Sequence, residues 1–218
     1  MISGTGHPLA YPVLTTIGAL VICIAWAPFA DVEQSAMLVA VGLVVLMYTG
    51  FRCAVAFGVV PWRTAPAGEF RVKRVRQQYR LLSRSWLEFT IGGRTRWLPV
   101  YFDPALVTMV DADGSFDATV LVDGRRLFPS GRVRDSEPRG RLIDNPTRPD
   151  PDGAAHAASA GLLGRRLLLD AQSAVAAPFA GLFWIYIAGG GFPAFIGATV
   201  VAAAAATWFS AVRGSDPS

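Results

Sequence analysis

Basic residues crowd one stretch of the chain, and contact with an anionic partner is the chemistry they suggest first. This basic arm, residues 69–83, carries Arg71, Lys73, Arg74, Arg76 and Arg80, with apolar side chains between them. Beside a membrane, each basic residue contributes about 1 kcal/mol of attraction to an anionic leaflet. The spacing fits a helix or a strand, and two interpretations stay open. One is a lipid-contacting patch that Arg165 and Arg166 extend, and the other is the solvated face of an ordinary element.

Aromatic and basic side chains also alternate just after that arm, and we take them as a candidate interaction surface. Its residues are Trp86, Arg94, Arg96, Trp97 and Tyr101. Such a mixture can bind nucleic acid by stacking and charge. However, residues 62–166 hold eighteen basic and twelve acidic side chains. That balance is too mixed for strong attraction to phosphates, so no nucleic-acid partner is expected.

The sequence contains no catalytic or metal-binding pattern. His7 and His156 are far apart, and no cluster of His, Cys, Asp or Glu has metal-ligand spacing. Asp111 opens a run that resembles a calcium loop, but Phe116 and Val122 occupy the positions that require glycine and glutamate. Nucleotide-binding glycine loops and the G-x-S-x-G motif are missing from the sequence. We expect no cofactor and no enzymatic activity.

Four apolar stretches are long enough to cross a bilayer. They cover about residues 11–30, 36–60, 171–188 and 194–212, and about 20 apolar residues span the hydrocarbon core. The connections at 31–35 and 189–193 are short, so each pair forms a helical hairpin. Pro61 ends the second span, and Trp62 and Arg63 suit the membrane interface. Arg52 lies inside this span near its end, where it either snorkels to the interface or contacts a helix or headgroup.

The polar sequence between the two hairpins shows strand signals. Residues 86–91 and 94–102 flank Gly92-Gly93, which indicates a two-residue hairpin with Ile91 opposite Arg94. Pro99 cannot donate to a ladder, so its strand lies at an edge or is bulged. Further strands are expected at 105–110, 118–122 and 125–128, with a turn at 111–114. Five short strands are enough for a compact β-barrel or a partly open sheet.

The domain boundaries follow from these elements. Residues 1–61 form the first hairpin, 62–134 the basic arm and β-domain, 135–170 a Pro/Arg-rich linker with an interfacial helix, and 171–218 the second hairpin. The linker, at 135–153, is expected to be extended and mobile. The predicted fold class is an α+β membrane protein with four transmembrane helices, as two hairpins, and an inserted small cytoplasmic β-barrel-like domain.

The distribution of positive charge predicts the orientation. Nineteen of the 20 Lys and Arg residues lie between Arg52 and Arg166, and the last is Arg213. The short connections at 31–35 and 189–193 contain none. The protein is expected in the cell (inner) membrane. By the positive-inside rule, its central domain and both termini are predicted to lie in the cytoplasm.

This layout, together with the run GRTRWLPVYFDPALVTM at residues 93–109, resembles small four-pass membrane proteins of mycobacteria and related actinobacteria. Among that group, it is similar to the lipid uptake coordinators that stabilise Mce lipid importers. The resemblance covers about a tenth of the chain and brings no catalytic motif. It implies an accessory subunit that protects or assembles a lipid-import complex.

Three functions are weighed. The first is a non-enzymatic membrane adaptor, because the spans are rich in small residues that allow close helix packing and no reactive group is evident. Its partners would be membrane lipid and other subunits of a membrane complex. The second is a sensor or tether of anionic lipid that uses the basic residues of 71–80 and Arg165-Arg166. The third is an enzyme of envelope lipid metabolism with Asp103 or Glu88 as its acid/base group.

Overall fold

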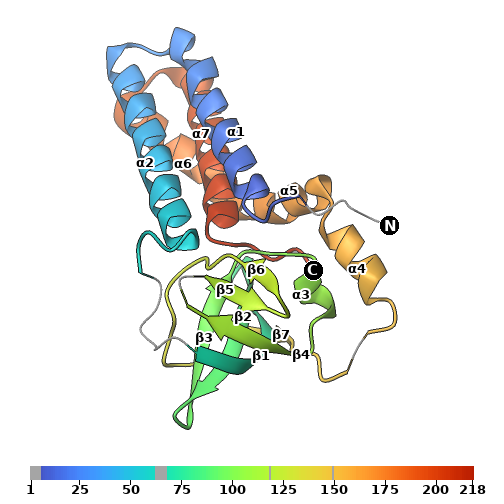
Figure 1. Ribbon diagram of the computed structural model, residues 1–218. Helices are drawn as coiled ribbons and strands as arrows, with labels where there is room; N and C mark the ends of the chain where they lie inside the picture. Colours follow the sequence, from blue (N-terminus) through green and yellow to red (C-terminus); the bar gives the residue numbers. More distant parts are fainter. Residues whose placement is uncertain (1–5, 62–67, 118, 149) are drawn as a thin grey trace.

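The computed structural model describes residues 6–61, 68–117, 119–148 and 150–218. It contains a helical layer and a β-domain beneath it, with the C-terminus between the two (Figure 1). The predicted interface positions of Trp62 and Arg63 lie outside the described residues.

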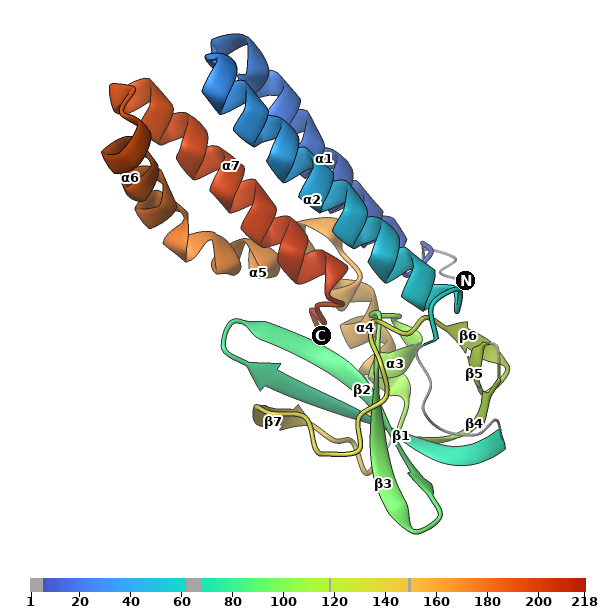
Figure 2. The same cartoon turned by 90° about the vertical axis from the view of Figure 1, so that its left-hand side faces the viewer.

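The helical layer is built from two hairpins. Helices α1 (Ala10–Trp26) and α2 (Val32–Ala56) form the first, joined by the 3-10 turn η1 (Ala27–Phe29). Helices α6 (Ala177–Ala188) and α7 (Gly191–Val212) form the second. Helix α1 packs on both α2 and α7, whereas α2 and α7 touch only slightly. Figure 2 shows α1 with α2 and α6 with α7 as two adjacent pairs.

Among the described residues, four helical segments are long and apolar enough to cross a membrane, which identifies a multi-pass membrane protein. Helix α6 alone would reach only about 18 Å at 1.5 Å per residue. The candidate third span therefore runs from Leu163 to Ala188 and includes α5 (Leu163–Ala171) and the 3-10 turn η2 (Gln172–Ala176). In Figure 2, α5 runs across the lower end of the helices before the chain rises into α6.

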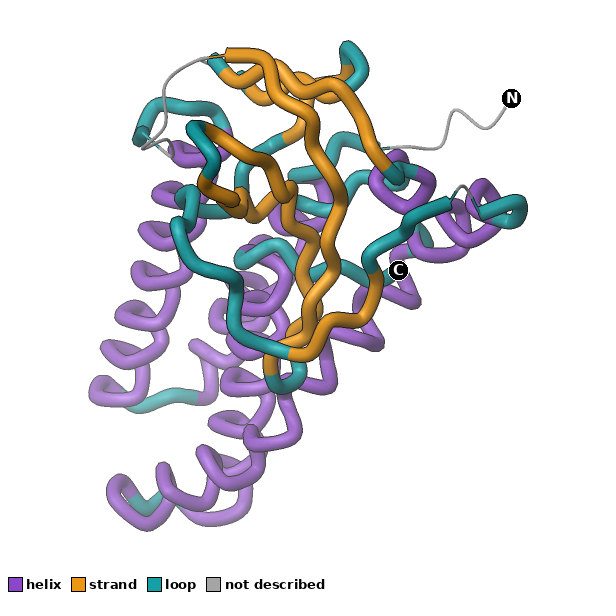
Figure 3. The backbone as a smooth tube through the Cα atoms, turned by 90° about the horizontal axis from the view of Figure 1, so that it is seen from below, coloured by secondary structure: helices purple, strands orange, loops and turns teal. Residues whose placement is uncertain are grey.

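The β-domain is one seven-stranded antiparallel sheet in the order β3-β2-β1-β4-β5-β6, with β7 also paired to β1. Its strands are β1 (Gly68–Tyr79), β2 (Leu82–Ile91), β3 (Arg94–Val100), β4 (Asp111–Phe116), β5 (Val120–Val122), β6 (Arg125–Leu127) and β7 (Arg141–Asp144). Strand β1 is the centre, because its first half pairs with β4 and its second half with β7. Figure 3 shows the strands gathered on one side of the helices.

The two predicted hairpins are confirmed. Ile91 pairs with Arg94 across Gly92 and Gly93, whose φ values of 56° and 75° suit a tight turn that favours glycine. Val122 pairs with Arg125 across the second turn. Strand β3 is an edge strand, as Pro99 required.

The prediction of barrel-like closure is wrong, because the sheet remains open between β6 and β3. The chain after β6 does reach β3, where Val100 and Pro129 form an isolated bridge and Tyr101 N donates to Phe128 O at 2.8 Å. Pro99 and Pro129 both lack an N–H group, so a continuous ladder cannot form there.

Two local predictions are also wrong. Residues 105–110 do not form a strand; a short helix, α3 (Ala105–Thr108), begins after Asp103, whose Oδ1 accepts a hydrogen bond from Ala105 N at 2.9 Å. Residues 111–114 are not a turn but belong to β4. Strand β4 is stabilised across β1 by ion pairs from Arg71 to Asp111 and Asp113.

Part of the predicted linker is ordered into the fold. Arg141–Asp144, expected in an extended mobile segment, forms β7 and pairs with the second half of β1. The region then enters two helices, α4 (Gly153–Ala160) and α5. The β-domain therefore draws its last strand from beyond residue 134.

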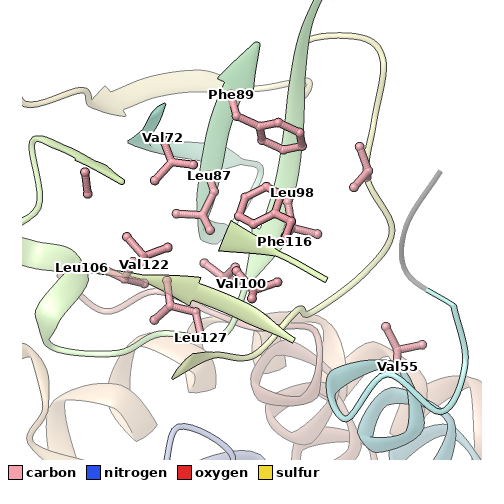
Figure 4. Packing of buried hydrophobic residues seen from close by; sticks show 13 residues of the cluster. Val55, Val72, Leu87, Phe89, Leu98, Val100, Leu106, Phe116, Val122 and Leu127 are labelled. Atoms are coloured by element: carbon pink, nitrogen blue, oxygen red, sulfur yellow. The ribbon is translucent and has the colours of Figure 1, made fainter. Parts of the chain in front are cut away.

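The core of the β-domain lies on one face of the sheet. Its largest members include Leu87, Phe89, Leu98 and Phe116 (Figure 4), and the rings of Phe89 and Phe116 meet edge to face with centroids 4.7 Å apart. The sharing of one face by Leu87, Phe89, Leu98 and Val100 is confirmed. Val55, near the end of α2, belongs to the same cluster, so the core continues into the helical layer.

Candidate functional site

The polar contacts of the molecule converge on its C-terminal tail, residues 213–218. The tail leaves α7 through Gly214, whose φ of 82° is left-handed and whose added Cβ would lie 2.7 Å from Ser130. Only glycine fits such a turn without strain. The tail then runs along β2, where Asp216 N donates to Ser83 O at 2.9 Å. Ser215 and Asp216 are buried.

Asp216 forms a buried ion pair with Arg74 of β1. Arg74 Nη2 lies 3.0 Å from Asp216 Oδ2, and both side chains are at most 1% exposed. Ser85 donates to the same carboxylate oxygen, and Ser218 donates to Oδ1 at 2.6 Å. Burial by itself raises the pKa of Asp216, but the charges of Arg74 and Arg76 and these hydrogen bonds outweigh it and hold the pKa below its usual range. The carboxylate is therefore ionised at neutral pH.

A second buried carboxyl group joins the tail to the first helix. Asp170, at the end of α5, accepts hydrogen bonds from Tyr11 Oη and from Ser215 Oγ, each at 2.8 Å. The Arg166 guanidinium stacks over the Tyr11 ring at 4.0 Å from its centroid. Arg165 Nε donates to the Pro217 carbonyl at 3.1 Å. Helices α1 and α5 are thus bound to the same segment that holds β1 and β2.

A third set of polar contacts involves the carbonyl of Val212, at the end of α7. This carbonyl accepts from Arg52 Nε of α2 at 3.2 Å and from Tyr101 Oη at 2.8 Å. Burial raises the pKa of Tyr101 to about 12, so the phenol keeps its proton and can donate. Arg52 Nη2 also donates to the Ser130 carbonyl. Arg52 therefore contacts a neighbouring helix, which is one of the alternatives that the sequence left open for this residue.

A small cavity of about 140 Å³ lies between the β1–β2 hairpin, α5 and the tail. Arg76, Gln78, Arg166 and Gln172 line it together with Asp170 and Asp216. Burial lowers the pKa of Arg76, although the nearby Asp216 carboxylate acts in the opposite direction. The two carboxylates offset the two arginines, so the cavity has no net preference for an anion.

A larger apolar cavity of about 370 Å³ lies between the two hairpins, at the end away from the β-domain. Trp26, Met37, Trp184 and Val201 contribute to its walls, and Gln34 supplies a polar group. Helices α2 and α7 both line this cavity, and they make few contacts with each other.

The residues of the candidate interaction surface lie in different environments. Trp86 and Tyr101 are buried, Arg96 and Trp97 are half-buried, and Arg94 is exposed. Arg96 Nε pairs with Asp135 at 3.1 Å, and Trp97 Nε1 donates to Glu88 at 3.0 Å. Of the five, Arg94 alone offers a largely free side chain at the end of the β2–β3 hairpin.

The candidate lipid-contact residues are also divided. Lys73 and Arg80 are exposed, Arg71 is exposed but paired with Asp111 and Asp113, and Arg74 is buried against Asp216. Arg76, Arg165 and Arg166 lie beside the tail and the small cavity. The residues of the basic arm thus have different roles: Arg71, Lys73 and Arg80 face solvent, whereas Arg74 and Arg76 face the tail.

The residues considered for acid/base catalysis have structural contacts. Asp103 is buried, accepts a hydrogen bond from Ala105 N at the start of α3, and lies 3.7 Å from Arg125 Nε. Glu88 accepts from the Trp97 indole. His156 contacts Asp150 at 2.7 Å on the surface, far from His7 in sequence. Among the described residues, no group of three or more His, Cys, Asp or Glu could hold a metal ion.

Sequence reasoning did not identify Tyr11, Asp170, Ser215 or Asp216 as members of one network. Asp170 carried a usable signal, since a carboxylate at the start of an apolar span needs a partner. The sequence of the tail contained no signal of this kind, because a short polar chain end is normally solvated. Chemically, the network can hold the helices and the β-domain in one orientation. No protein-family model, curated protein or solved structure matches this chain.

Proposed function

We propose that this chain is a non-enzymatic accessory subunit that stabilises or assembles a larger membrane complex. One observation carries the proposal: a buried polar network around the tail joins the β-domain to both helical hairpins. Asp216 of the tail, which follows α7, bonds to Arg74 of β1, and Ser215 bonds to Asp170, which in turn bonds to Tyr11 of α1. A flexible tether needs freedom of movement between its parts. A subunit that presents a surface to a partner benefits from a fixed orientation, because less entropy is lost on binding.

We propose that the β-domain and both termini lie on the cytoplasmic side of the cell membrane. Arg52, Arg165, Arg166 and Arg213 all lie near the end of the helical layer that faces the β-domain. The connections at the other end contain no Lys or Arg. This asymmetry follows the positive-inside rule.

We further propose a lipid-import system as the partner complex. The resemblance of residues 93–109 to actinobacterial lipid uptake coordinators supports this choice. That run forms β3 and α3 in the β-domain. The exposed turn beside Arg94 is the part of the run from which a partner subunit would be contacted.

The test is affinity purification of the tagged full-length chain, expressed at native abundance, in a mild detergent. A photo-crosslinking residue at position 94 identifies the neighbours of the β2–β3 turn in intact cells. We expect membrane-complex subunits to co-purify and to crosslink there. Recovery of the chain alone, without any membrane complex, contradicts the proposal.

A matched pair of variants separates a specific contact from general charge. Arg94→Glu should reduce co-purification at least several-fold, because it reverses the charge of the proposed contact. Arg80→Glu places the same change in the turn of the neighbouring β1–β2 hairpin, where Arg80 is also exposed. We expect that variant to retain the partner. Equal recovery with both variants would exclude the β2–β3 turn as the contact.

A further inference from the structure

A basic cluster without acidic partners lies where the helices meet the β-domain, and it begins with Arg84 of β2. The Nε and Nη2 atoms of Arg84 are shielded from solvent and have no hydrogen-bond partner among the described residues. A buried guanidinium normally pairs with a carboxylate, since desolvation of an unpaired charge is costly. Arg84 forms no such ion pair within the described part of the chain.

Two further arginines come from the ends of transmembrane helices. Arg213 caps the end of α7, directly after Val212. Arg52 of α2 donates to the carbonyl of Val212 at 3.2 Å, so Arg52 lies beside the end of α7 from which Arg213 follows. The tail that follows Arg213 returns to β2 next to Arg84, where Asp216 N bonds to Ser83 O.

The fourth arginine comes from the segment that borders β3. Arg134 lies over the Trp86 ring at 5.3 Å from its centroid. Trp86 and Arg84 are two residues apart on β2 and so lie on the same face of the strand. Arg134 is exposed, whereas the other three are half-buried, so the cluster is open on one side. None of the four pairs with a carboxylate within the described residues.

Electrostatics support the convergence of these side chains. Burial, and after it the charges of Arg213, Arg52 and Arg134, together lower the pKa of Arg84 to about 9. The Tyr48 phenol opposes this shift of the Arg84 pKa. Arg84 is still protonated at neutral pH. The helix C-termini bring only partial negative charge, which does not neutralise four cations.

We propose that Arg52, Arg84, Arg134 and Arg213 bind the phosphate of an anionic phospholipid headgroup. The guanidinium fork matches phosphate oxygens and forms short charge-assisted hydrogen bonds with them. Arg52 and Arg213 stand at the ends of membrane-spanning helices, which is the depth of the headgroups. Phe209, one turn before Arg213, is 41% exposed, and its ring lies 4.8 Å from the Arg213 guanidinium. The acyl chain of a lipid whose phosphate is bound there can therefore lie along α7, against Phe209.

This site differs from the lipid patch expected in the basic arm. Arg71 is paired with two aspartates, and Arg74 is paired with Asp216. Their charges are already compensated within the chain. Arg84 lies outside that arm, and its compensation must come from a bound group or from solvent ions.

The test uses the purified full-length chain in a neutral detergent, with its thermal unfolding followed during lipid titration. Phosphatidylglycerol should raise the melting temperature in a saturable way, and phosphatidylcholine should not. Inorganic phosphate at millimolar concentration should neither reproduce the shift nor abolish it. A shift equal with phosphate alone, to which phosphatidylglycerol adds nothing, overturns the lipid assignment in favour of a free anion.

Variants make the assignment specific. Arg84→Gln should weaken the response to phosphatidylglycerol at least tenfold in lipid concentration while leaving the lipid-free melting temperature equal or higher, because an unpaired buried charge is removed. Arg134→Gln, at an exposed position, should weaken the response without affecting the fold, and it keeps the test decisive if Arg84→Gln unfolds. The control Arg139→Gln, at another exposed position, should respond like the parent protein. An unchanged response in both Arg84→Gln and Arg134→Gln overturns the proposal.

Discussion

Arg74 and Asp216, separated by 142 positions in the sequence, meet at 3.0 Å in the interior of the protein. Arg74 belongs to the central strand of the sheet, and Asp216 follows the last membrane-spanning helix. Their contact fixes the end of α7 against the β-domain. It is the contact that most directly makes the two layers one structure.

Removal of one partner from this pair should destabilise the protein strongly. Asp216→Ala leaves the Arg74 guanidinium buried without its main counter-charge, and such a loss costs about 3–5 kcal/mol. Denaturant unfolding of the purified chain in mild detergent measures the change. Asp144→Ala is the control, because Asp144 is 44% exposed and lies 3.5 Å from the same arginine. We expect that control to cost under about 1 kcal/mol, and equal losses in the two variants would contradict a dominant role for Asp216.

The same carboxylate should make stability depend on pH in the acid range. The pKa of Asp216 in the folded chain lies below its usual value of about 3.9. Its stabilising contribution is therefore complete above about pH 4 and is lost as the pH falls through the lower, folded-state pKa. Melting temperatures of the parent and of Asp216→Asn should differ by a constant amount above about pH 4 and converge only as the pH falls below that value, through the folded-state pKa of Asp216. Asp113→Asn, which alters an exposed ion pair, should keep a nearly constant difference from the parent.

The turn after α7 should tolerate only glycine. Gly214→Ala introduces a Cβ 2.7 Å from Ser130 and forces a left-handed φ on alanine. Strain of this kind costs about 1–3 kcal/mol. Gly164→Ala, in the exposed part of α5 with open space around it, should instead gain up to about 1 kcal/mol. Thermal melts of the two variants should move in opposite directions, and a neutral Gly214→Ala would show that the tail can take another path.

The hydrogen bond from Tyr11 to Asp170 should contribute measurably to the joint between α1 and α5. Tyr11→Phe leaves one buried carboxylate contact unmade and should cost about 1–3 kcal/mol. Tyr186→Phe removes the same hydroxyl from a side chain that is 87% exposed and should have no effect. Unfolding free energies in the same detergent compare the two. No loss in Tyr11→Phe would mean that Ser215 alone satisfies the carboxyl group.

Local sequence patterns were sufficient for the elements that depend on near neighbours. The four apolar spans follow from unbroken runs of apolar residues, and the hairpin at Gly92-Gly93 follows from two residues that accept positive φ. The edge position of β3 follows from the missing N–H of Pro99. Each of these depends on residues within a few positions of one another.

Tertiary structure decided the rest. Asp111–Phe116 has the composition of a turn, yet it becomes a strand because β1 supplies hydrogen bonds and Arg71 neutralises two of its aspartates. Arg141–Asp144 becomes β7 because the second half of β1 has a free edge. The site itself depends on contacts from residue 11 to residue 216, and no local pattern specifies which distant carboxylate a buried arginine will meet. The sequence by itself determined the layers and the sign of the charge between them. Only the fold determined which arginines are neutralised and which, like Arg84, are left for a partner.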